Sequence, residues 1–111
     1  MAATPSINIV IPQGVDFGEV FTSTESDGSL SDITDFTGVS KIKKYPGSPK
    51  SFSFNVGINS ETSEVSIAMS AAVTVSIKPG RYFYDIVLTS PTGGVSRLVE
   101  GSAMVTAGIS T

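Results

Sequence analysis

The alternation of side chains in residues 51–58, SFSFNVGI, decides the fold class. The four apolar residues of this segment are separated by small or polar residues, a two-residue period that places them on one face of a β-strand. Residues 64–69, EVSIAM, repeat the pattern, and the polar residues 59–63 between the two segments are typical of a turn. We therefore expect two neighbouring strands, each with one buried face and one solvated face.

Further β-rich segments flank this pair and are separated by clusters of Gly, Pro, Ser and Asp. They are residues 7–11, 15–22, 39–45, 81–89 and 95–105. Bulky side chains on both faces of residues 81–89 predict a central strand, and Gly101 suggests a bulge in the last one. Residues 70–74 are the single helical candidate, with Ser70 as N-cap. The pattern predicts an all-β fold, an antiparallel β-sandwich of about seven strands with at most one short helical turn.

Length and composition indicate one folded domain. We expect residues 1–111 to form a single β-sandwich, with 1–5 and 107–111 as terminal arms. The chain is 40% hydrophobic and 15% charged, which favours a real core and argues against disorder. Residues 1–5 lack the features of a signal peptide, and the apolar runs are too short to span a membrane, so we expect no membrane partner.

Charge gives little support to a nucleic-acid partner. The formal net charge is −3, whereas nucleic-acid binders usually present a dominant basic face. The basic residues do include one cluster, formed by Lys41, Lys43 and Lys44 with Lys50 nearby. We interpret this cluster as a solvated edge strand or turn, where lysine discourages edge-to-edge pairing.

The residues available for catalysis are few. The chain has no His and no Cys, which removes Ser-His-Asp and Cys-His mechanisms and most zinc sites. Asp32 and Asp35 could act as an acid–base pair beside a sugar cleft, or bind calcium together with Asp27. The simpler interpretation is that these carboxylates bond to backbone N–H groups in turns. We expect no enzyme, with no catalytic residue, cofactor, metal or small-molecule substrate.

Two features of the last strands have specific interpretations. If residues 81–89 and 95–105 pair around the turn at 91–94, Asp85 and Arg97 come close enough for a cross-strand ion pair. Residues 82–84, YFY, are typical of a core or interface strand, although they could also form an aromatic face for a ligand.

Four motifs, in order along the chain, resemble those of small structural proteins of tailed bacteriophages. Their "QG-x-DF" opening is matched by residues 13–17, their "DLTG" turn by 32–38, their "GRYxYDL" strand by 80–86, and their "RLxEGxxxVTPGVT" ending by 97–108. Two extra residues precede the Thr-Gly of the second motif, and Ala107 stands where the pattern prefers proline. The motifs supply the candidate structural and interaction residues: Gln13, Gly14, Asp16, Phe17, Gly80, Tyr82, Tyr84, Asp85, Arg97 and Glu100.

The resemblance implies an immunoglobulin-like β-sandwich, related to the N-terminal domains of phage baseplate and fibre-attachment proteins, and it brings no catalytic residues. We therefore expect a virion protein, made in the host bacterial cytoplasm, that docks on other virion proteins. Its place is the tail, baseplate or fibre-attachment region, or the head exterior as a decoration, in many copies or as a homo-oligomer. The alternative is a glycan- or host-receptor-binding module that uses Tyr45 or Phe83.

Overall fold

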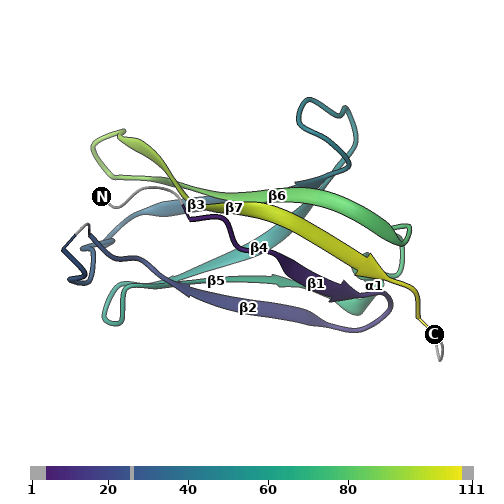
Figure 1. Ribbon diagram of the computed structural model, residues 1–111. Helices are drawn as coiled ribbons and strands as arrows, with labels where there is room; N and C mark the ends of the chain where they lie inside the picture. The colour runs from purple at the N-terminus through teal and green to yellow at the C-terminus, as the bar shows by residue number, and fades with distance from the viewer. Residues whose placement is uncertain (1–4, 26, 109–111) are drawn as a thin grey trace.

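Seven strands and one short helix make up the described part of the chain, residues 5–25 and 27–108 of a computed structural model (Figure 1). The elements are β1 (Ile9–Pro12), β2 (Phe17–Thr22), β3 (Thr37–Lys43), β4 (Ser51–Asn59), β5 (Glu64–Met69), α1 (Ala71–Thr74), β6 (Gly80–Thr89) and β7 (Val95–Thr106). The all-β class, the number of strands and the single helical turn predicted from the sequence are confirmed.

The strands form one sheet in the order β1-β7-β6-β3-β4-β5-β2. All neighbouring strands are antiparallel except β1 and β7, which run parallel. β4 changes partner along its length, because its first half pairs with β3 and its second half, from Asn55, pairs with β5. Figure 1 shows β3, β6 and β7 in one layer and β2 and β5 in the other. The sheet is therefore nearly a barrel, and a sandwich of two separate sheets is not confirmed.

The core lies between these two layers, where the inward side chains of successive strands meet. An aromatic cluster occupies its centre: the rings of Phe17 and Phe54 are 5.8 Å apart, and those of Phe54 and Tyr84 are 6.5 Å apart. Burying one large aliphatic side chain contributes about 1.5–3 kcal/mol to stability. The fully buried aliphatic residues around this cluster are Ile11, Ile33, Ile42, Val65, Ile67, Ile77, Ile86, Leu88, Val99 and Val105.

The central position expected for residues 81–89 is confirmed, since β6 lies between β3 and β7. The side chains of Tyr82 and Tyr84 are buried on its inner face. Phe83 points to solvent on the opposite face and is 43% exposed. The strand is thus paired with β7 along its whole length and with β3 from Phe83 onward, and it is packed on one face.

The bulge in β7 lies at Leu98, and the prediction of a bulge at Gly101 is wrong. Ile86 pairs with Val99 and Val87 pairs with Arg97, which leaves Leu98 as the extra residue. Leu98 and Val99 are both buried, so the alternation of the strand changes parity at this point.

Gly101 has a different role, because the chain before β1 passes over it. A Cβ atom at this position would lie 2.1 Å from the carbonyl oxygen of Ile7. A glycine is needed here for close backbone approach and not for a change of register.

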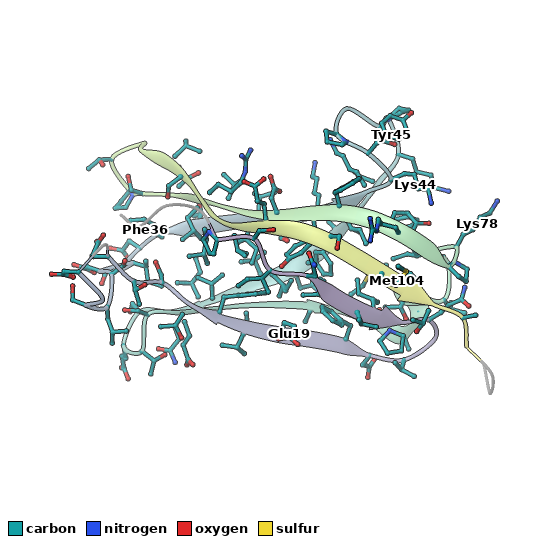
Figure 2. All side chains as sticks on the ribbon, in the orientation of Figure 1. Glu19, Phe36, Lys44, Tyr45, Lys78 and Met104 are labelled. Atoms are coloured by element: carbon teal, nitrogen blue, oxygen red, sulfur yellow. The ribbon has the colours of Figure 1, made fainter. Side chains whose placement is uncertain are left out.

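Two other local predictions are only partly right, for tertiary reasons. Ser70 is the N-cap residue of α1, as predicted, but its side chain makes no capping bond; instead the carboxylate of Asp16 accepts a hydrogen bond of 2.8 Å from the N–H of Ala71. The lysine cluster does not mark an edge, because β3 lies between β6 and β4. Lys41 and Lys43 lie on the solvent face of an interior strand, and Lys44 lies with Tyr45 on the projecting β3–β4 loop (Figure 2).

The proposed terminal arms are described only in part, since residues 1–4 and 109–111 lie outside the described residues. The carbonyl of Pro5 accepts a hydrogen bond from the N–H of Glu100. The N–H of Gly108 donates to the side-chain oxygen of Gln13 at 3.3 Å. The described ends of the chain are therefore attached to the body of the fold.

Candidate functional site

The residues of the first motif hold the turn between β1 and β2 against the α1 segment. The side-chain amide of Gln13 donates to the carbonyl oxygens of Val75 and Ile77 at 3.2 and 3.1 Å. Gly14, with a φ of 84°, donates its N–H to the hydroxyl of Thr74 at 3.0 Å. The positive φ explains why glycine stands at this position of the turn.

Thr74 completes this contact from within the core. Its side chain is fully buried, and its hydroxyl also donates to the carbonyl oxygen of Val15 at 2.9 Å. We call Gln13, Gly14, Asp16 and Thr74 the turn clamp. The hydrogen bonds named for these four residues are all made within the chain, so the turn clamp has a structural role.

The residues of the "GRYxYDL" motif are also mostly internal. Gly80 begins β6 with a φ of 147°. The hydroxyl of Tyr82 donates to the carbonyl oxygen of Lys78 at 2.7 Å, and the ammonium of Lys44 lies 4.9 Å from the centre of its ring. Tyr82 is therefore a core residue whose hydroxyl bonds within the chain, and it is not part of a ligand-binding face.

Tyr84 is the most perturbed titrating group of the inner face. Its hydroxyl donates to the carbonyl oxygen of Ile7 at 2.6 Å. Burial, and then the nearby carboxylate of Glu19, raise the pKa of Tyr84 to about 12. The side chain therefore stays neutral and keeps donating this bond throughout the physiological pH range.

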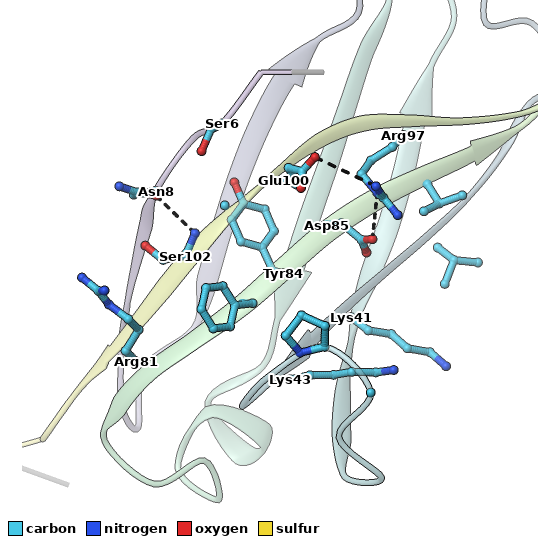
Figure 3. Close-up of a pocket in the computed structure, with 16 residues that line it drawn as sticks. Ser6, Asn8, Lys41, Lys43, Arg81, Tyr84, Asp85, Arg97, Glu100 and Ser102 are labelled. Atoms are coloured by element: carbon cyan, nitrogen blue, oxygen red, sulfur yellow. Dashed lines mark hydrogen bonds and ion pairs between the residues drawn. The ribbon is translucent and has the colours of Figure 1, made fainter. Parts of the chain in front are cut away.

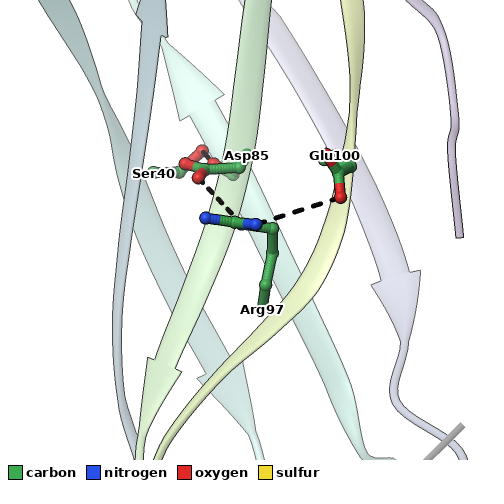
Figure 4. Close-up of polar contacts among 4 residues, drawn as sticks. All are labelled: Ser40, Asp85, Arg97 and Glu100. Atoms are coloured by element: carbon green, nitrogen blue, oxygen red, sulfur yellow. Dashed lines mark hydrogen bonds and ion pairs between the residues drawn. The ribbon is translucent and has the colours of Figure 1, made fainter. Parts of the chain in front are cut away.

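Asp85, Arg97 and Glu100 form a charged group on the solvent side of β6 and β7 (Figure 4). Asp85 and Glu100 stand directly opposite each other across the two strands, an arrangement that is unfavourable for like charges. Arg97 lies 3.2 Å from the Asp85 carboxylate and 3.9 Å from that of Glu100. The cross-strand ion pair of Asp85 and Arg97 predicted from the sequence is confirmed, and Arg97 also lies close enough to Glu100 to weaken the repulsion between the two carboxylates.

The bulge at Leu98 makes this group possible. In a regular strand, residues 97 and 100 face opposite sides of the sheet. Because Leu98 and Val99 both turn inward, Arg97 and Glu100 both turn outward. In the sequence, the bulge is indicated by two adjacent apolar residues, Leu98 and Val99, between two charged ones.

The solvent side of β3, β6 and β7, here called the outer face, is built from three cross-strand rows. Asp85 lies between Lys41 and Glu100 in the middle row. The two other rows are Lys43–Phe83–Ser102 and Val39–Val87–Arg97. Basic and apolar side chains therefore share one surface.

A groove of about 940 Å³ lies on this outer face (Figure 3). Pro46 and Gly47 of the β3–β4 loop line it on one side, and Ser6 and Asn8 line it from the segment that leads into β1. Phe83 contributes apolar surface to it. Four of the ten candidate residues line this groove: Tyr84, Asp85, Arg97 and Glu100.

Charge is unevenly divided between the groove and the rest of the molecule. Four of the seven basic residues and two of the ten acidic residues line the groove, which gives it a net charge of +2 and leaves −5 elsewhere. Three of its cations, Lys41, Lys43 and Arg81, have no carboxylate within 4.0 Å among the described residues. This groove attracts anionic groups, although the chain as a whole is acidic.

Two carboxylates of the loop between β2 and β3 stabilise local turns. Asp32 accepts hydrogen bonds from the N–H and the hydroxyl of Thr34, and Asp27 does the same with Ser29. These bonds, the hydroxyl one first, hold the pKa of both aspartates below the ordinary value of 3.8. Over residues 5–25 and 27–108, no three acidic side chains gather closely enough to hold a metal ion. No helix in the same ranges is long and apolar enough to cross a membrane.

The comparisons with known proteins give no family. A scan against protein-family models finds no match, and a search of curated proteins finds none either. An internalin-like protein of Listeria monocytogenes is 12% identical, with a TM-score of 0.45 over 94% of this chain and 28% of that one. A family 123 glycoside hydrolase from Clostridium perfringens is 16% identical, with a TM-score of 0.44 over 96% of this chain and 24% of that one. This chain thus spans about a quarter of each, and neither likeness bears on its function.

The structure divides the ten candidate residues into two groups. Those of the first motif and the two tyrosines lie in the turn clamp or the core, and Gly80 begins β6, whereas Asp85, Arg97 and Glu100 lie on the outer face. Sequence reasoning missed Thr74, which looked like part of a helical turn, and Val39 and Val87, which border the groove. No local pattern distinguishes these residues from ordinary strand or turn residues.

Proposed function

We propose that this chain is a non-catalytic structural component of a tailed-bacteriophage virion, and that it docks on other virion proteins through the outer face. The observation that carries the proposal is the division among the motif residues. Of the ten candidate residues taken from those motifs, seven lie in the turn clamp, the core or the start of β6, and the other three, Asp85, Arg97 and Glu100, lie on the outer face at the groove.

The composition of the outer face supports docking. Val39 and Phe83 are 57% and 43% exposed, and they lie among lysines and arginines at the groove. Protein interfaces commonly combine an aromatic residue at the centre with charged residues that select the partner. In a particle with many copies, modest contacts at each site add up through avidity.

The direct test is the protein content of particles of the phage whose genome encodes this chain. Mass spectrometry of particles purified by density gradient is expected to detect it in many copies per particle. Its absence from intact particles overturns the proposal. Labelling with an antibody in electron microscopy then distinguishes the tail, baseplate and fibre-attachment region from the head exterior.

A matched pair of variants tests the outer face in the same particles. K41E/K43E reverses two charges at the groove, and K50E/K78E makes the same change in net charge at lysines that do not line it. We expect the first variant to be lost from particles and the second to be retained. Equal retention of both excludes the groove as the docking surface.

A second candidate function is recognition of a glycan or host receptor, and one observation favours it. Tyr45 is 54% exposed on the β3–β4 loop, and Phe83 is exposed as well. Exposed aromatic rings can stack on sugar rings or other ligands. A glycan array probed with the wild-type chain and with Y45A and F83A tests this function, and an array without hits removes it.

A further inference from the structure

We propose that copies of this chain dock head to tail, with the acidic loop of one copy seated in the outer-face groove of the next. The acidic loop is defined as residues 27–36, which contain Asp27, Asp32 and Asp35 and no basic residue. This inference rests on the proposed function, because it names the two surfaces through which one copy of the proposed virion component contacts the next.

The groove is chemically suited to this loop. Lys41, Lys43 and Arg81 line it without a carboxylate partner within 4.0 Å among the described residues. The three aspartates of the acidic loop are exposed. Opposite charges on the two surfaces favour this pairing and disfavour groove against groove.

Apolar surface is complementary in the same way. Leu30 lies within the acidic loop and is 57% exposed. Phe83 and Val39, beside the basic residues of the groove, are also exposed. A leucine flanked by carboxylates therefore matches an apolar floor flanked by cations, and desolvating both strengthens the contact.

The acidic loop is ordered before it binds. Asp27 holds the N–H and hydroxyl of Ser29, and Asp32 holds those of Thr34. The same bonds hold the pKa of both carboxylates below the ordinary value, so the charge of the loop persists at mildly acidic pH. A preorganised loop loses less conformational entropy on docking than a flexible one.

The positions of the two surfaces fix the kind of assembly. Figure 1 shows the β2–β3 loop at one end of the molecule and the β3–β4 loop, which lines the groove, toward the other end. Two different surfaces therefore meet in every contact, and the assembly is heterologous. Such contacts produce rings when the rotation closes, and open rows when it does not.

Sedimentation velocity over a concentration series tests the inference. We expect the mass of the wild-type chain to rise with concentration beyond that of a dimer in about 50 mM salt, and the affinity to fall at least about tenfold in 500 mM salt. K41E/K43E and D27N/D32N are each expected to stay monomeric. Asparagine keeps the side-chain oxygen that Ser29 and Thr34 bond, so D27N/D32N removes charge while leaving the loop in place.

A mixture of the two variants gives the decisive result. K41E/K43E keeps the acidic loop and D27N/D32N keeps the groove, so an equimolar mixture is expected to form one-to-one pairs that grow no further. K50E/K78E, with the same charge change outside the groove, is expected to associate like the wild type.

Three outcomes overturn the inference: a wild-type chain that stays monomeric up to about 1 mM in low salt, where surface electrostatics are strongest, a mixture without pairs, or equal loss of association in K50E/K78E. These outcomes are independent of the particle assay. A chain found in particles but monomeric in solution refutes head-to-tail docking and leaves the proposed function standing. A chain that associates in solution but is absent from particles refutes the proposed virion function and leaves head-to-tail docking standing.

Discussion

The hydroxyl of Tyr84 donates a hydrogen bond of 2.6 Å to the carbonyl oxygen of Ile7, 77 residues away in the sequence. This bond attaches the segment before β1 to the centre of the sheet. Gly101 lies opposite Tyr84 on β7. Because glycine has no side chain, the carbonyl of Ile7 can approach the strand at this point.

We expect Y84F to lower the free energy of unfolding by about 1 kcal/mol, because it leaves the Ile7 carbonyl without this donor. Urea denaturation followed by circular dichroism measures the change. An unchanged midpoint contradicts a structural role for the bond. Tyr45 is exposed, so Y45F serves as the control with the same chemical change.

The raised pKa of Tyr84 makes stability fall at high pH. Below a pH of about 10 the phenol is protonated in both the folded and the unfolded chain. As the pH rises from about 10 to about 12, the unfolded chain releases the proton first, so the free energy of unfolding falls by at most about 3 kcal/mol. Urea midpoints across this range, compared with those of Y84F, isolate the effect. A slope that persists in Y84F assigns it to other groups.

Replacing Gly101 with alanine is expected to destabilise the chain by about 2–3 kcal/mol. The added Cβ would lie 2.1 Å from the carbonyl oxygen of Ile7. This oxygen is a backbone atom, so it cannot move aside as easily as the end of a flexible side chain. Gly18 is the matched control, since its Cβ would meet an oxygen only at 3.9 Å. If G101A and G18A melt at the same temperature, the close approach of Ile7 is refuted.

The turn clamp predicts a clear difference between two substitutions at Thr74. T74V keeps the shape but removes the hydroxyl, which leaves the N–H of Gly14 and the carbonyl of Val15 without their partner, at a cost of about 2 kcal/mol. T74S keeps the hydroxyl and is expected to lose less. Denaturant midpoints check the order, and the hypothesis fails if T74S is the less stable variant.

Within the outer charged group, removal of Arg97 is expected to cost more than removal of Asp85. These side chains are partly exposed, so D85A lowers the free energy of unfolding by only about 0.5 kcal/mol. R97A removes the cation closest to both Asp85 and Glu100 and leaves the two carboxylates facing each other, at a cost of about 1 kcal/mol. Thermal melting at low and high salt measures both, and the excess loss in R97A should shrink as salt screens the repulsion.

Alternation was sufficient to predict the strands because each has one buried face. In residues 51–58 and 64–69, large apolar residues alternate with small or polar ones, and β4 and β5 follow these segments closely. The pairing of Asp85 with Arg97 followed from a short connection between β6 and β7. Both predictions use contacts that are local in sequence.

What could not be predicted depends on contacts between distant segments. The Gly at 101 looked like a bulge because the sequence does not reveal that Ile7 passes over it. Ser70 is the N-cap residue of α1, but the side-chain bond to the first helical N–H comes from Asp16, 55 residues before Ala71. The groove needs β3, β6, β7 and the segment before β1 side by side, which no single stretch encodes.

The parallel pairing of β1 with β7 has a mechanical consequence. Ile9–Pro12 lie alongside Ala103–Thr106 in the same direction, so the chain enters β1 and leaves β7 at opposite ends of the paired stretch. A force that pulls on the two ends loads these hydrogen bonds together in shear and does not unzip them singly. The chain should therefore withstand stretching along this axis better than a hairpin of equal length.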